Sequence, residues 1–205
     1  MEYDVKIIKK AQYNISSWSG GTTTELFIYP ENSKYTENNF KWRISSATVD
    51  CDVSNFTNLP GISRKLMVIE GSTTLEHENH YSVHLKPFEK DSFKGEWATK
   101  SYGRVIDFNL MTTEGCTGNI NSLVIESNKQ IKLGFIKMDS PYKSVAKYYY
   151  SPEEGFEIVV NNEHYLVDKK ELFCITFPEK YELSDLYILN VSLKDNKIIE
   201  TTVYY

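Results

Sequence analysis

The sequence predicts an all-β protein, and three observations lead to this prediction. Nearly every segment of the 205 residues reads as a short strand bounded by turn residues. The 15 Tyr and 10 Phe favour strands, where flat rings pack across a pleated surface. No long amphipathic helix is found, because Pro60 and Gly61 break the best helical segment, residues 53–64. Many strands at close spacing with polar turns indicate a sandwich or a barrel.

Each expected strand is a run of β-branched, aromatic or alternating apolar residues that ends at a Gly, Asn, Asp, Ser or Pro turn. In chain order, these strands are residues 22–30, 40–49, 65–71, 73–78, 81–85, 103–112, 131–138, 156–162, 163–167, 171–177 and 186–193.

The chain length suits either one large all-β unit or two small fused barrels. A weak internal repeat favours two halves, because ENHYSV at 78–83 returns as NEHYLV at 162–167. In both copies a polar tip joins two strands, as a hairpin requires. We therefore expect a barrel over residues 1–120 and a smaller barrel over 121–205, tightly packed as one unit. The boundary falls in the Gly-, Asn- and Ser-rich stretch 117–128.

Charge and composition exclude several classes of partner. The formal net charge is −5, and acidic and basic residues are interspersed. The sequence therefore contains no basic stripe that would bind nucleic acid or an anionic membrane. The first residues lack an uninterrupted apolar run, and no later run approaches the ~18 residues of a transmembrane helix. Cys51, Cys116 and Cys174 are far apart and odd in number, which indicates buried, reduced thiols. We expect a cytoplasmic protein.

Two of the predicted strands carry charged and hydroxyl side chains on faces that a core would normally fill. In residues 40–49, alternation places Arg43 and Ser45 on one face with two small apolar residues. In residues 62–71, it places Arg64 and Glu70 together with two aliphatic residues. Burying an unpaired charge costs on the order of several kcal/mol. Two interpretations stay open, namely a salt bridge that holds the strands in register and a ligand site.

The strand at residues 103–112 has a similar polar face. Ile106, Phe108 and Leu110 alternate onto one face, which is plainly core, whereas Asp107 and Asn109 lie on the other. The second face is either solvent-exposed surface or one wall of a mostly apolar pocket with a few placed polar groups.

The segment WSGGTTTE combines two glycines with a following strand that carries Glu25. A phosphate-binding loop would need a helix after the glycines, and residues 22–30 are a predicted strand, so the sequence argues against a nucleotide loop. The favoured interpretation is a tight turn or bulge at a strand start, next to Trp18.

The histidines do not have metal-ligand spacing. Two histidines two residues apart could face one metal from a strand, but Asn79 stands where the second would be needed. His77 and His80 flank a predicted turn and fall on opposite faces, so they are interpreted as solvated hairpin residues. No Ser or Cys lies in a G-x-S-x-G context that would indicate a nucleophile.

Four blocks together resemble the HutD/Ves family of bicupin proteins over about residues 15–115. The chain departs from the family pattern at Ser19, where an asparagine is expected, and at Leu59, where a phenylalanine is usual. The matching blocks, in order, are WSGGTTTE, FKWRISSATV, NFTNLPGISRKLMVIEG and DFNLMT.

The resemblance implies a double-stranded β-helix, the jelly-roll-like cupin barrel, duplicated in one chain as a bicupin. It also implies a cytoplasmic protein without the usual cupin metal ligands. Members often occur with histidine-utilisation enzymes and have been proposed to bind a small acid such as formylglutamate. The residues at family-patterned positions, which we take as candidates for a ligand site, are Trp18, Glu25, Arg43, Ser45, Arg64, Glu70, Asp107 and Asn109.

From these residues we expect a binding protein for a small carboxylate metabolite, without metal or cofactor and with a possible homodimer. Arg43 or Arg64 would hold the carboxylate through paired donors, while Ser45 and Asn109 supply neutral hydrogen bonds. The three acidic candidates would balance the arginines, and their excess negative charge equally allows an amine-bearing or doubly functional ligand.

Two other classes of function remain open. The first is an enzyme, an isomerase or hydrolase that uses Glu70 or Asp107 as a general base beside Arg43. The second is a structural or protein-binding module, which closed salt bridges without a cavity would favour.

Overall fold

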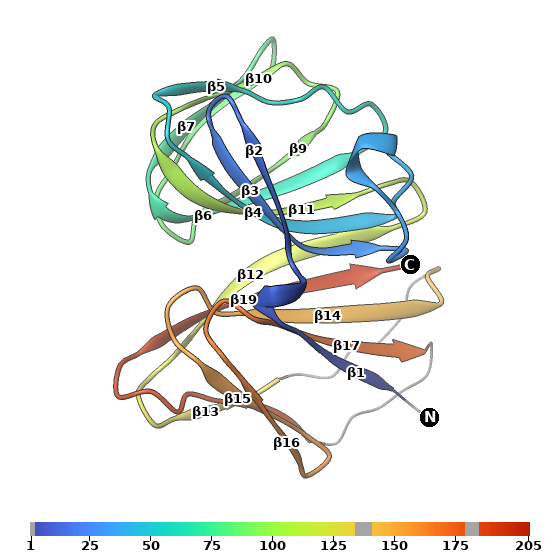
Figure 1. The fold of residues 1–205 in the computed structure, drawn as a ribbon, viewed down its shortest axis with the longest axis vertical. Coiled ribbons are helices and arrows are strands. Elements are labelled where there is room, and N and C mark those ends of the chain that lie inside the picture. Colours follow the sequence, from blue (N-terminus) through green and yellow to red (C-terminus); the bar gives the residue numbers. More distant parts are fainter. Residues whose placement is uncertain (1–2, 134–140, 179–184) are drawn as a thin grey trace. The chain divides into compact units, whose positions relative to one another are not determined.

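The chain forms an all-β protein, as a computed structural model shows for residues 3–133, 141–178 and 185–205 (Figure 1). The described residues contain no α-helix and only two short 3-10 helices, η1 (Lys10–Gln12) and η2 (Tyr35–Glu37). The all-β prediction is therefore confirmed. Part of the strand expected at 131–138 lies outside the described residues, and its described start forms β13 (Gln130–Lys132).

The N-terminal unit, residues 13–120, consists of two antiparallel sheets. In order across the sheet, the six-stranded sheet holds β2 (Asn14–Trp18), β3 (Gly21–Tyr29), β4 (Trp42–Val49), β11 (Val105–Thr112), β6 (Ser63–Gly71) and β9 (Lys90–Lys94). The four-stranded sheet holds β5 (Val53–Asn55), β10 (Thr99–Tyr102), β7 (Thr73–His77) and β8 (Tyr81–Leu85).

The C-terminal unit comprises residues 3–12 and the described part of 121–205, again in two sheets. Its five-stranded sheet holds β1 (Asp4–Ile8), β17 (Leu172–Pro178), β14 (Ser144–Tyr150), β19 (Asn196–Tyr204) and β12 (Thr117–Ile125), the last of which begins before the division. Its four-stranded sheet holds β13, β18 (Leu186–Leu189), β15 (Phe156–Val160) and β16 (Glu163–Val167).

The expected boundaries need one correction, at the start of the chain. Residues 3–12 belong to the C-terminal unit and not to a barrel over residues 1–120, because β1 pairs with β17 from Asp4↔Thr176 to Ile8↔Leu172. Val5 and Ile7 pack against the core of that unit. A pairing over more than 160 residues leaves no local trace in the sequence.

The two units repeat one strand order. The order β5-β10-β7-β8 of the N-terminal unit recurs as β13-β18-β15-β16, and β4-β11-β6-β9 recurs as β12-β19-β14-β17. The sequence repeat falls on the matching hairpins, β7–β8 and β15–β16. Asn79 in the first turn, and Asn161 and Asn162 in the second, take the left-handed backbone conformation that such turns need. The duplicated architecture predicted from the sequence is thus confirmed.

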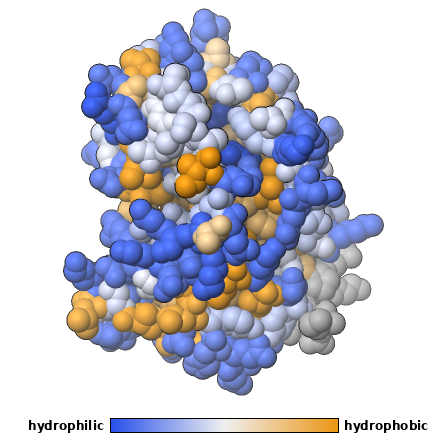
Figure 2. Space-filling model, viewed as in Figure 1, coloured by the Kyte–Doolittle hydropathy of each residue, from blue (hydrophilic) through white to orange (hydrophobic). Residues whose placement is uncertain are grey.

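The described residues allow two further observations on the surface and the cysteines. The face drawn in Figure 2 is mainly hydrophilic, with orange patches between blue areas. Among the described residues, no helix is long and apolar enough to cross a membrane. The three cysteines are free, but only Cys174 is buried; Cys51 and Cys116 are half-buried, contrary to the expectation for all three.

Candidate functional site

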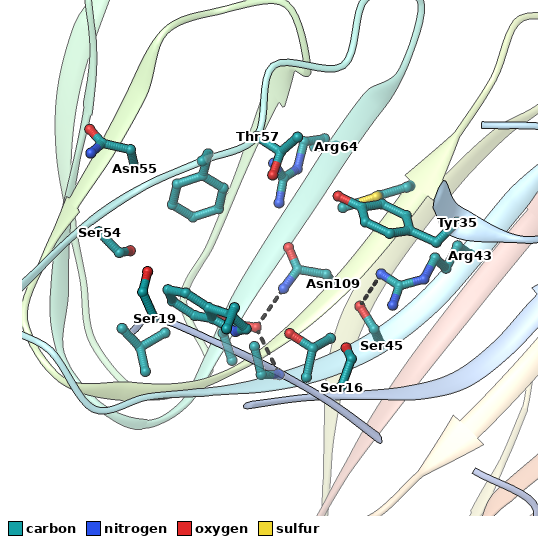
Figure 3. A pocket seen from close by; sticks show the side chains of 17 residues that line it. Ser16, Ser19, Tyr35, Arg43, Ser45, Ser54, Asn55, Thr57, Arg64 and Asn109 are labelled. Carbon is teal, nitrogen blue, oxygen red and sulfur yellow. Dashed lines mark hydrogen bonds between the residues drawn. The ribbon is translucent and has the colours of Figure 1, made fainter. Parts of the chain in front are cut away.

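The N-terminal unit encloses a pocket of about 410 Å³ (Figure 3). This volume suits a small metabolite. One wall is the inner face of the six-stranded sheet, and the other comes from β5 and the residues that follow it. The lining residues are Ser16, Trp18, Ser19, Thr23, Tyr35, Arg43, Ser45, Ala47, Val49, Ser54, Asn55, Phe56, Thr57, Arg64, Asp107, Asn109 and Met111.

Strand alternation and register bring most of the predicted site residues to this pocket. On β4 and β11, Ser45 pairs with Asn109 and Arg43 pairs with Met111, so their side chains share the inner face. Of the eight predicted site residues, six line the pocket, namely Trp18, Arg43, Ser45, Arg64, Asp107 and Asn109. Glu25 lies behind the lining and binds Arg43, and Glu70 does not reach the pocket.

The position of Glu70 corrects the sequence-based interpretation. Simple alternation placed Glu70 on the same face as Arg64, but the pairing of β6 with β11 shifts register between Ile106 and Asp107. Val68 lies opposite Asp107 and Glu70 lies opposite Ile106, so β6 contains one extra residue at this point. A bulge of this kind inverts the alternation beyond it. Glu70 is consequently exposed.

Arg43 is held by partners within the protein. Its Nε donates to Glu25 Oε2 at 2.7 Å, and its Nη1 donates to Ser45 Oγ at 3.1 Å. The guanidinium also lies over the Tyr35 ring, 4.4 Å from its centroid. Both side chains of the ion pair are largely buried, at 6% exposure for Arg43 and 15% for Glu25. This arginine is therefore neutralised and fixed before any ligand arrives.

Arg64 has no such partner. It is 5% exposed, and no described residue forms an ion pair or a hydrogen bond with its guanidinium, whose Nε is buried and unsatisfied. The guanidinium lies over two rings, 4.5 Å from the centroid of Phe56 and 5.2 Å from that of Phe93. Desolvation lowers the pKa of Arg64 to about 10. The pocket thus contains a buried, unneutralised cation, and Figure 3 shows it pointing toward the same space as Asn109.

Asp107 and Asn109 form the polar floor of the pocket on β11. Asp107 Oδ1 accepts hydrogen bonds from the Ala47 backbone N–H at 3.3 Å and from Asn109 Nδ2. Burial raises the pKa of the Asp107 carboxyl to about 7, although these two bonds and the charge of Arg64 oppose the rise. The Asn109 Oδ1 is buried without a partner. The site therefore offers unused acceptors beside an unused cation.

The first glycine of WSGG, Gly20, is explained by the pocket wall. A Cβ at Gly20 would overlap the Trp18 ring and the Cys51 sulfur, so only glycine lets the ring fold back over this position. The turn and strand start expected here are observed as β2, a turn and β3. Trp18 lies at the pocket and is 38% exposed.

Some lining residues were missed by sequence reasoning. Tyr35 lies in η2 within a polar segment that has no strand pattern, and nothing in the sequence indicated that it would cover Arg43. Phe56 follows the short strand β5, and only its position in the NFTNLPG block of the family pattern marked it. The lining hydroxyls of Ser16, Thr23 and Ser54 gave no distinct signal.

The interpretation of the histidines is wrong for His77. It is 2% exposed, with Nδ1 2.8 Å from Thr99 Oγ1 and Nε2 2.8 Å from Asp91 Oδ2. His77 ends β7 facing the interior, whereas His80 is exposed in the turn and stacks on Trp97 at 3.9 Å. Within the described ranges, no group of three or more His, Cys, Asp or Glu side chains is placed to hold a metal ion.

Comparison with solved structures supports the class that the architecture defines, the bicupins. A conserved protein of unknown function from Pseudomonas aeruginosa PAO1 superposes with a TM-score of 0.77 at 16% identity, over 98% of both chains. A mutant of the oxalate decarboxylase from Bacillus subtilis superposes with a TM-score of 0.67 at 6% identity, over 95% of this chain and 76% of its own. At these identities the likeness concerns the fold, and it confirms the duplicated cupin barrel.

The chain belongs to the HutD family, whose model matches residues 10–176. The structure of HutD from Pseudomonas fluorescens SBW25 superposes with a TM-score of 0.63 at 19% identity, over 97% of this chain and 98% of that one. No curated protein matches the chain in sequence. The family resemblance read from the four sequence blocks is thereby confirmed.

Proposed function

We propose that the N-terminal unit binds a small metabolite through a carboxylate on Arg64. One observation carries the proposal: Arg64 is a buried cation in a pocket without an ion pair to any described residue. A buried charge without a partner is costly, and a ligand carboxylate would offset that cost through charge-assisted hydrogen bonds. The planar guanidinium suits two-point recognition of a carboxylate.

The proposal assigns different roles to the two arginines. Arg43 is already bound to Glu25 and Ser45, so it supports the wall and orients Tyr35. Arg64 is the arginine with unused donors. Asn109, with a free Oδ1, and Asp107 then provide the polar groups that distinguish one acid from another.

The family supplies the first ligand to test. The name HutD connects the chain with histidine utilisation, and a formylglutamate-like acid carries carboxylates together with an amide N–H for Asn109. We propose a cytoplasmic binding or regulatory protein that works without a metal or cofactor. A homodimer, which exposed sheet edges would allow, remains a prediction that light scattering on the purified chain would test.

Isothermal titration of the purified chain with formylglutamate, glutamate and related acids tests the proposal. We expect binding by the unmodified protein and its loss in Arg64→Met. Glu70→Gln, on the exposed outer side of the same strand, is the matched control and should bind normally. The absence of heat with every acid, or unchanged binding after Arg64→Met, would remove the proposal.

A second candidate function rests on Asp107. A carboxyl with a pKa of about 7 inside a pocket can exchange a proton with a ligand near neutral pH, so an isomerase or hydrolase with Asp107 as general base is a defined alternative. Glu70 no longer fits this role, because it lies outside the pocket. Turnover of a bound acid, lost in a folded Asp107→Asn variant, would favour the enzyme over the binding protein.

A further inference from the structure

Three polar groups at the pocket lack a partner among the described residues. The Nε of Arg64 is an unused donor, and the Oδ1 of Asn109 is an unused acceptor. Asp107 receives both of its hydrogen bonds on Oδ1, from Ala47 N–H and Asn109 Nδ2, so its Oδ2 receives none. All three side chains are 5% exposed or less. Arg64 Nε and Asn109 Oδ1 are fully buried, and buried polar atoms are normally satisfied, so these two atoms at one pocket point to a ligand.

The two unused acceptors belong to side chains that contact each other. Asp107 and Asn109 alternate onto the same face of β11, and a direct hydrogen bond joins their side chains. A single donor group with two or more hydrogens, placed against this pair, could bond to Asp107 Oδ2 and Asn109 Oδ1 together. An ammonium group has three hydrogens and a positive charge, whereas an amide N–H or a hydroxyl offers one hydrogen.

The unused donor lies on the neighbouring strand. Arg64 of β6 pairs with Met111, and Leu66 pairs with Asn109, so the cation is displaced along the sheet from the acceptor pair. Arg64 and Asp107 nevertheless interact electrostatically, because the charge of Asp107 acts to raise the pKa of Arg64 against the desolvation that lowers it. The other nearby cation, Arg43, is already neutralised by Glu25. A ligand that is negative at one end and positive at the other would satisfy both ends of the pocket.

We infer that the pocket recognises an amino acid in its zwitterionic form, with the carboxylate on Arg64 and the ammonium between Asp107 and Asn109. The inference rests on the proposed function and narrows it, because it adds a requirement for a cationic donor to the requirement for a carboxylate. A plain dicarboxylic acid would fill the Arg64 end and leave the two acceptors without hydrogens. A ligand acylated on nitrogen would supply one neutral hydrogen and no charge.

Matched ligands that differ only at the nitrogen test the inference by titration calorimetry at pH 8, where Asp107 is largely ionised. The pairs are glutamate with glutarate, aspartate with succinate, and alanine with propionate, with N-formylglutamate as the neutral N–H member. We expect at least one amino acid to bind about tenfold or more tightly than its deaminated partner, the effect of a charged hydrogen bond. N-formylglutamate should fall between glutamate and glutarate.

Three variants distinguish the zwitterion inference from the proposed carboxylate site on which it rests. Asp107→Asn keeps an oxygen for the Ala47 and Asn109 hydrogen bonds, so it should fold and retain carboxylate binding but lose the preference for the amine. Asn109→Ala should reduce the same preference. Arg64→Met should abolish binding of every ligand. If each amino acid bound with the same affinity as its deaminated partner, and Arg64 were still essential, the zwitterion inference would be overturned and the proposed carboxylate site would be retained. No binding of any ligand to the unmodified chain would overturn both.

Discussion

Arg64 and Asp107 line one pocket from the neighbouring strands β6 and β11, and they do not form an ion pair. Each is almost completely buried, at 5% and 3% exposure. Opposite charges in a protein interior normally meet, because an uncompensated buried charge is costly. Their separation means that the fold keeps both available to the pocket. We therefore expect the unliganded protein to be less stable than a variant of the same barrel that lacks the unpaired charge.

The first prediction concerns the stability cost of Arg64. Arg64→Met removes the unpaired guanidinium and leaves a flexible apolar chain between the rings of Phe56 and Phe93. We expect the free energy of unfolding of the unliganded protein to rise by about 1 to 3 kcal/mol. Urea unfolding followed by circular dichroism measures the change.

Arg43→Met is the matched control for this substitution. It exchanges the same residue types in the same pocket, but it deprives the largely buried Glu25 carboxylate of its partner. We expect a loss of about 2 to 4 kcal/mol, in the opposite direction. If both variants were destabilised equally, the distinction between a structural and a ligand-binding arginine would fail.

The second prediction concerns Asp107 and pH. Its pKa is about 7 in the folded protein and near 4 in an unfolded chain, so the folded state holds a proton between these values that the unfolded state has lost. The contribution of Asp107 to the free energy of unfolding therefore falls as pH rises from about 4 to 7, and it levels off above pH 7. Asp107→Asn removes this dependence. Its stability relative to the parent protein should increase from pH 4 to pH 8 by on the order of 4 kcal/mol at most.

Thermal unfolding of both proteins in one buffer series measures this difference. Every other titrating group is shared by the pair, so subtraction isolates Asp107. A difference that stays flat over the series, or that shrinks as pH rises, would show that the carboxyl is not protonated in the folded state.

Strand alternation in the sequence predicts the pocket lining correctly at those positions where the strands pair without a shift in register. Arg43 and Ser45 on β4, and Asp107 and Asn109 on β11, share faces as simple alternation requires, because these strands pair one to one. The prediction fails for Glu70, where a bulge beside Asp107 inverts the alternation. A bulge arises from tertiary packing, and no residue in ISRKLMVIEG predicts it.

Residues outside the strands were harder to place for a different reason. Tyr35 reaches Arg43 from a 3-10 turn, and a loop side chain has no periodicity from which its direction could be inferred. His77 looked solvated because it stands beside a turn, yet its partner Asp91 lies on β9, fourteen residues away and in the other sheet. Such pairings depend on how two sheets close over each other, which local sequence does not determine.

The third prediction concerns the wall at Gly20. In Gly20→Ala, the added methyl group would overlap the Trp18 ring and the Cys51 sulfur, so the ring must move from its place at the pocket. We expect a red shift of tryptophan emission and binding of the acid ligand weakened by about tenfold or more, with the fold retained. Fluorescence titration reports both effects. Ser17→Ala, exposed on β2 and outside the lining, should change neither.

The fourth prediction separates two histidines that are three residues apart. His77→Ala removes a buried ring that bonds to Thr99 and Asp91 and packs 4.6 Å from Phe93. The Asp91 bond joins β7 to β9 and hence one sheet to the other. We expect a loss of about 2 to 4 kcal/mol of stability from the cavity and the two broken bonds.

His80→Ala should cost no more than about 1 kcal/mol, because it removes one exposed stacking contact with Trp97. Because Phe93 also contacts the guanidinium of Arg64, His77→Ala should weaken acid binding as well, whereas His80→Ala should not. Urea unfolding and titration of the same two variants measure both effects. Equal stability losses would mean that the buried hydrogen bonds of His77 across the sheets contribute little to stability.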